Sequence, residues 1–197
     1  MTTRSRILIA VTALLLVAAY GLPLWKIELE APQYPEGLGM YIRLDTIEGV
    51  NPHDLGNING LNHYIGMARI EPESFPELRL MPWVLGGLIA AGLVTAWSAR
   101  RGLLYAWTAV FLVAALAGMV DFYVWGYQYG RNLDPRAAIK VPGLSYQPPI
   151  IGSKRLLNFT AHSWPAAGGW IAIAAGVAIV LVTGAELRDG RRASHVH

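Results

Sequence analysis

Four long apolar runs constrain this 197-residue chain more than any other feature of its sequence. They lie at about residues 7–24, 81–97, 103–125 and 166–183. Each approaches the ~20 apolar residues that a helix needs to cross the hydrocarbon of a bilayer. Only 15% of the residues are charged, whereas about 25% is usual in a soluble domain. The sequence therefore predicts four transmembrane helices in a single membrane domain over residues 1–197.

The basic residues of the short connections all fall on one side of these spans: Arg4, Arg6, Arg100, Arg101, Arg188, Arg191 and Arg192. By the positive-inside rule that side is the cytoplasm, so both termini are expected inside. The first run could also be a cleaved secretory signal. Because it continues to Trp25 and three more spans follow, we favour an uncleaved anchor in a bacterial inner (cytoplasmic) membrane.

Two long polar segments, about 25–80 and 128–165, then lie outside. The first holds nine acids and four bases, a formal charge of −5, and the second five bases and one acid, +4. We expect the two segments to pack on each other; alternatively, each recruits a partner of opposite charge. The alternation in 25–30 predicts a short strand, with 40–44 as its partner. Turns are expected from Asn51 and two turns of helix over 61–70. The predicted fold class is all-α membrane, with a small extracytoplasmic lid of short strands, turns and helix from the two loops.

His63 and Met67 are four residues apart, so on a helix they would share one face. Imidazole and thioether together suit copper, and Cu(I) in particular. His53, Met40 and His162 lie in the outer segments and could complete such a metal site. The asparagine-rich stretch 57–62 could orient His63 through hydrogen bonds, as metal-bound histidines generally require. In the alternative interpretation, His63 forms a hydrogen bond within the lid and Met67 is packing.

Other chemistries have little support in the sequence. Because there is no cysteine, disulfides, zinc–thiolate sites and iron–sulfur clusters are excluded. No phosphate-binding loop, Ser-His-Asp arrangement or pair of catalytic carboxylates is recognisable, and nothing indicates nucleic-acid binding. A haem held between His63 and His162 would be unusual, because neither lies in a span. Asp121 falls inside the third run, where a carboxylate normally has a partner or a task.

Several stretches resemble a bacterial family of small multispan membrane proteins: Trp25, residues 31–38 (APQYPEGL), 61–67 (LNHYIGM) and 140–149 (KVPGLSYQPP). That family is associated with maturation clusters of nitrous oxide reductase, a copper enzyme. The resemblance covers both outer segments and the spans between them. It implies an accessory role in supplying copper or electrons to an extracytoplasmic metalloenzyme.

Three functions follow from these observations. The first is an accessory membrane protein for copper handling, assembly or docking of a periplasmic copper-dependent respiratory enzyme, working beside a periplasmic or membrane protein partner. The second is a purely structural subunit of a membrane respiratory or transport complex that binds no metal. The third is a membrane enzyme or small-molecule carrier that uses Asp121 and His63.

Overall fold

The computed structural model of the protein describes residues 1–139, 145–156 and 158–194. Within them, four helical segments are long and apolar enough to cross a membrane. The first is α1 (Thr3–Leu15) with the 3-10 helix η1 (Leu16–Tyr20), and the others are α3 (Pro76–Ser98), α4 (Arg101–Arg131) and α5 (Ala167–Ser194). The four predicted spans are thus present, and these helices are compatible with a multi-pass membrane protein.

The boundaries of the helices differ from the predicted spans. Apolar composition predicts only the part of a helix that suits hydrocarbon, and two of the helices extend beyond it. Helix α3 begins at Pro76, and helix α4 continues to Arg131. Pro76 occupies the first turn of α3, where no amide donor is needed. Pro82 therefore lies inside the helix.

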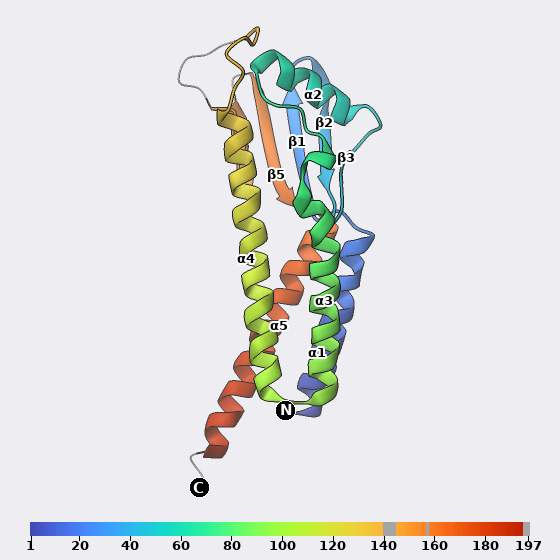
Figure 1. Ribbon diagram of the computed structural model, residues 1–197, viewed down its shortest axis with the longest axis vertical. Helices are drawn as coiled ribbons and strands as arrows, with labels where there is room; N and C mark the ends of the chain where they lie inside the picture. Colours follow the sequence, from blue (N-terminus) through green and yellow to red (C-terminus); the bar gives the residue numbers. More distant parts are fainter. Residues whose placement is uncertain (140–144, 157, 195–197) are drawn as a thin grey trace.

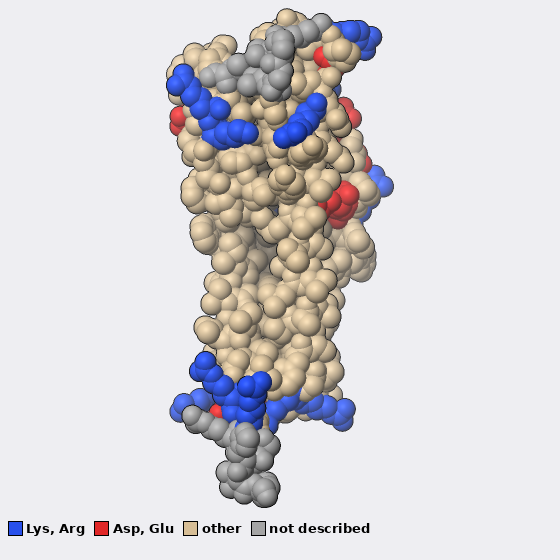
Figure 2. All heavy atoms as spheres, turned by 90° about the vertical axis from the view of Figure 1, so that its left-hand side faces the viewer, with Lys and Arg blue, Asp and Glu red and all other residues tan. Residues whose placement is uncertain are grey.

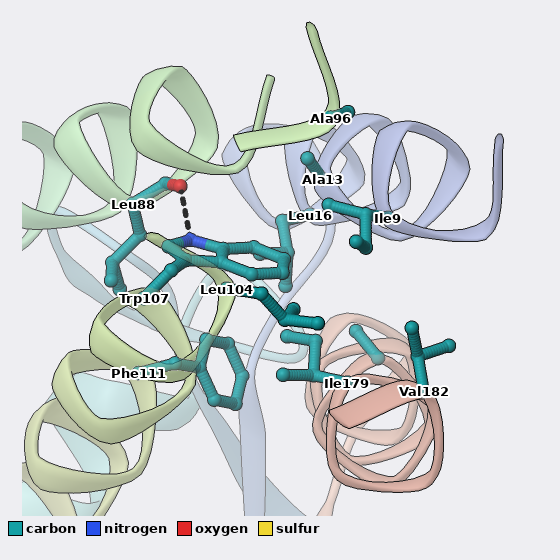
Figure 3. Close-up of a cluster of buried hydrophobic side chains, with 11 residues drawn as sticks. Ile9, Ala13, Leu16, Leu88, Ala96, Leu104, Trp107, Phe111, Ile179 and Val182 are labelled. Carbon is teal, nitrogen blue, oxygen red and sulfur yellow. Dashed lines mark hydrogen bonds between the residues drawn. The ribbon is translucent and has the colours of Figure 1, made fainter. Parts of the chain in front are cut away.

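The helices form a four-membered bundle in which α1 and α4 each contact both α3 and α5. Figure 3 shows the core of this bundle, where Leu104, Trp107 and Phe111 of α4 meet side chains of the other three helices. The Trp107 indole donates a hydrogen bond to the Leu88 carbonyl over 2.8 Å. A Cβ on Gly92 would lie 2.5 Å from the Trp107 ring, so the close approach of α3 and α4 depends on this glycine.

The outer segments fold into a five-stranded antiparallel sheet with strand order β3-β2-β1-β5-β4. Its strands are β1 (Trp25–Ala31), β2 (Tyr34–Ile42), β3 (Ile47–Gly49), β4 (Gly152–Leu156) and β5 (Phe159–Pro165). The central strand β1 pairs with β2 through a hairpin and with β5 from the second segment. The short helix α2 (Asp54–Ile65) lies over the sheet at the end of the molecule farthest from the termini (Figure 1).

The prediction of an all-α membrane fold is therefore wrong, because the outer segments form a continuous sheet above the helices. The alternation at residues 25–30 correctly predicts β1, and 40–44 overlaps its partner β2 only in part. The helix expected over 61–70 is instead α2, which starts at Asp54 and ends at Ile65. Its first half occupies residues for which the sequence predicts turns, from Asn51 onwards. The two segments do pack on each other, through the β1–β5 ladder.

The sheet has one covered face and one open face. Ile27 of β1 and Met40 of β2 are directly paired and point into a core completed by Ile58 of α2. Aromatic side chains of α4, together with Phe75 just before α3, extend this core toward the bundle, and the ring centroids of Phe122 and Trp125 are stacked 5.9 Å apart. The alternate residues of β1 are polar and face the other way.

Charged residues are concentrated at the two ends of the molecule, and a broad band between them is almost free of charge on the face shown in Figure 2. Both termini and the α3–α4 connection lie at the end opposite the sheet (Figure 1). The basic residues of the short connections are therefore on one side of the bundle, as the sequence predicts.

A buried carboxylate joins three helices at that end. Glu186 of α5 is fully buried and accepts hydrogen bonds from the Thr2 amide at 2.8 Å and from Arg101 Nε at 3.0 Å. Thr2 caps the first turn of α1, and Arg101 begins α4. Because a buried charge is costly without partners, this cluster fixes the relative positions of α1, α4 and α5.

We expect Glu186→Ala to lower the thermal unfolding midpoint of the detergent-solubilised protein by several degrees, because the Thr2 amide and Arg101 lose their common acceptor. The exposed Asp189, three residues further along α5, provides the matched control. Asp189→Ala should leave the midpoint close to that of the unchanged protein. Equal midpoints for the two variants would show that the Glu186 cluster does not hold the helices together.

Candidate functional site

The strongest sequence-predicted site lies where α2 ends. Its C-cap is Gly66 in the left-handed conformation, with φ of 81°. A Cβ there would lie 2.9 Å from Ala137 and 3.0 Å from the Asp134 backbone. Glycine is required on both counts, because a side chain would be strained at this φ and would push away the loop that follows α4.

The loop after α4 is tied to this helix end by backbone hydrogen bonds. The Asp134 amide donates to the Gly66 carbonyl at 2.8 Å, and the Ile139 amide donates to the Tyr64 carbonyl at 2.9 Å. Asp134 also accepts a hydrogen bond from the Arg136 amide at 2.8 Å. The second outer segment therefore completes a site that the first segment begins.

A pocket of about 250 Å³ forms at this junction. Its lining residues are His63, Tyr64, Gly66, Met67, Asp134, Arg136, Ala137 and Ala138. His63 is exposed and Met67 is half-buried. The two are not on one helical face, because α2 ends between them, but the turn at Gly66 still brings both to the same pocket. Asp134 and Arg136 were not predicted, because the sequence gives no sign that the two segments meet here.

The asparagines of 57–62 have a different role from the one predicted. They lie within α2 rather than in a turn, and Asn59 and Asn62 are buried. Asn59 accepts from the Ile70 amide at 2.7 Å and donates to the Ile70 carbonyl at 3.1 Å. Asn62 donates to the Ala68 carbonyl at 3.4 Å. Both bind the extended chain after Gly66 to the helix, and neither makes a described hydrogen bond to His63.

The structure does not bring the other predicted metal ligands to this pocket. Met40 is only 4% exposed and belongs to the core beneath the sheet. His53 precedes α2 and is exposed at the opposite end of that helix from His63. His162 lies on the open face of the sheet, where its Nδ1 is 2.6 Å from Ser153 Oγ and its Nε2 is 3.6 Å from a Glu30 oxygen. Of the five predicted ligands, only His63 and Met67 therefore line this pocket.

His162 instead lines a second, larger pocket of about 610 Å³. This pocket lies along the open face of the sheet near the β1–β2 hairpin, and its acidic lining includes Glu28, Glu30 and Glu36. No lysine or arginine among the described residues lines it. Its carboxylates favour cationic groups, although His162 already interacts with Ser153 and Glu30.

Asp121 is exposed on α4 and lines neither pocket among the described residues. It lies 20 residues after Arg101, a rise of about 30 Å along a helix. That length matches the hydrocarbon thickness of a bilayer. If Arg101 marks one boundary, Asp121 lies at the other, which favours the interpretation that it reaches water at the interface. Among the described residues, neither of these two pockets is lined by both Asp121 and His63.

No group of three or more His, Cys, Asp or Glu side chains in the described part of the chain is arranged to hold a metal ion. Of the residues that line the smaller pocket, His63 and Met67 carry the soft ligand atoms. Models of known protein families gave no match to this chain, and none of the curated proteins is similar to it.

We expect Asn59→Ala to destabilise the outer domain by about 1–3 kcal/mol, because both backbone groups of Ile70 would lose a buried partner. Hydrogen exchange of the Ile70 amide should accelerate in this variant. Asn57→Ala, in the same helix but half-buried and without a described side-chain hydrogen bond, is the matched control. Unchanged protection of Ile70 in Asn59→Ala would contradict the assigned role.

Proposed function

We propose that this protein is an accessory protein of a bacterial inner membrane and that it handles Cu(I) for a periplasmic copper enzyme. In this proposal both termini are cytoplasmic, and the outer domain formed by the sheet and α2 faces the periplasm. The observation that carries the proposal is that His63 and Met67 line one pocket at the membrane-distal end of that domain.

The chemistry of the pocket supports a soft cation. Neutral imidazole and thioether are ligands that Cu(I) accepts. The pocket also lies at the C-terminal end of α2, and His63 is in the last turn. The carbonyl groups at a helix C-terminus carry partial negative charge, which favours a bound cation. Arg136 opposes this effect, but its side chain is 89% exposed and its Nε lies 3.4 Å from Asp134.

The orientation can be tested by single-cysteine labelling, because the natural chain has no cysteine. Ser74 is exposed in the outer domain, and Gly102 is exposed at the opposite end of the bundle. In intact spheroplasts, a membrane-impermeant maleimide should label Ser74→Cys. It should label Gly102→Cys only after the membrane is permeabilised. The opposite pattern would show that the sheet is cytoplasmic.

Copper binding is tested with detergent-purified protein and a Cu(I)-chelating competitor. We expect one Cu(I) per chain, with a loss of affinity of at least about tenfold in both His63→Ala and Met67→Ala, which corresponds to about 1.4 kcal/mol. His53→Ala is the matched control, since His53 is an exposed histidine at the other end of α2, and it should bind like the natural chain. Binding that is absent, or is indifferent to His63 and Met67, would exclude this function.

A structural subunit without metal is the second candidate. Its support is the open face of the sheet, where Trp164 is 47% exposed beside the acidic pocket. Exposed aromatic side chains are typical anchors of protein interfaces. This function predicts that the protein binds no Cu(I) and that Trp164→Ala weakens association with a membrane complex.

A further inference from the structure

The supply of soft ligands in the whole chain limits how a copper ion could be bound. The sequence holds five histidines, five methionines and no cysteine. Of the described ones, only His63 and Met67 reach the pocket. Met40, His53 and His162 are placed elsewhere as described above, and Met1, Met81 and Met119 lie in or beside the helices of the bundle. His195 and His197 lie outside the described residues.

The loop residues that close the pocket do not complete a Cu(I) site either. Asp134 offers a hard carboxylate, one oxygen of which lies 3.4 Å from Arg136 Nε. The side chain of Arg136 is itself a cation. Cu(I) prefers sulfur and imidazole to carboxylate oxygen. Residues 140–144, which follow in the sequence, include no histidine, methionine or cysteine. A copper ion here would therefore have two soft ligands from this chain.

Apolar side chains are exposed at the rim of the same pocket. Tyr64 is 57% exposed and Ile139 is 47% exposed. They are neighbours, because the Ile139 amide donates to the Tyr64 carbonyl at 2.9 Å. Both lie near the outer end of α4, which continues to Arg131, ten residues and about 15 Å beyond Asp121.

From these observations we infer that the pocket is an open copper site that a partner protein completes. The inference rests on the proposed function. The partner docks on Tyr64 and Ile139 with an apolar surface and contributes a soft ligand, a thioether or an imidazole, to the ion held by His63 and Met67. The ion moves by ligand exchange, in which one copper–ligand bond forms as another breaks. Copper remains Cu(I), and no proton moves, because neutral imidazole and thioether bind without deprotonation.

The first test is X-ray absorption of the Cu(I)-loaded full-length protein in detergent. We expect a first shell of one nitrogen and one sulfur from the protein, with the sulfur lost in Met67→Ala. Adding N-acetylmethionine should add a second sulfur to the shell of the natural chain. A shell with three or more protein ligands that excludes the added thioether would overturn the inference and leave the proposed function standing. Absence of Cu(I) binding would overturn both.

The second test concerns the rim, with acetyl-Met-Leu-Phe-amide as a probe that carries both a thioether and apolar side chains. This peptide should bind the Cu(I)-loaded protein about tenfold more tightly than N-acetylmethionine does, because it also buries apolar surface. The advantage should be lost in the double variant Tyr64→Asp/Ile139→Asp. It should persist in Ile151→Asp, where the isoleucine is 54% exposed elsewhere in the outer domain. Equal affinities of the two probes for the natural chain would contradict docking at this rim.

Discussion

The antiparallel pairing of β1 with β5 is the interaction on which the outer domain depends, because it aligns Trp25 with Pro165 and Glu30 with Thr160. Each partner strand is continuous with the bundle, since β1 follows η1 and β5 leads into α5. The ladder therefore fixes the sheet directly above the helices. The loop that follows α4 meets the end of α2 through separate backbone hydrogen bonds to Gly66 and Tyr64.

The sequence predicts those elements whose structure depends on local composition alone. It does not predict the elements that form by pairing with residues distant in the chain. An apolar run of membrane length indicates a helix whatever surrounds it, so the four spans were recognisable. The alternation of Trp25 to Glu30 also indicated a strand. The five-stranded sheet was missed as a fold class, because β5 carries little alternation and its partner lies in the other segment. The predicted position of helix α2 was wrong, because its two glycines and three asparagines are typical of turns. In the structure, Asn59 lies within the helix and forms hydrogen bonds with the backbone of Ile70.

The candidate site was predicted in part. The spacing of His63 and Met67 indicated a pair of soft ligands, and both residues do line one pocket, although a left-handed glycine rather than a shared helical face brings them together. The suggested additional ligands do not line this pocket for physical reasons: Met40 alternates inward on β2, and His162 lies on the opposite face of the sheet. Asp134 and Arg136 could not have been anticipated, since their place depends on the tertiary pairing of the two segments.

Disulfide trapping across the sheet tests this account most directly, because the natural chain has no cysteine to interfere. Lys26 of β1 lies directly opposite Trp164 of β5, and Tyr41 of β2 lies opposite Lys26 on its other side. Under mild oxidation, Lys26→Cys with Trp164→Cys should form a disulfide. Tyr41→Cys with Trp164→Cys should not, because residues two strands apart are separated by about 10 Å, beyond the reach of about 7 Å between Cα atoms that a disulfide allows. If the first pair fails to form a disulfide and the second forms one readily, β1 does not lie between β2 and β5, and the sheet does not join the two segments in this way.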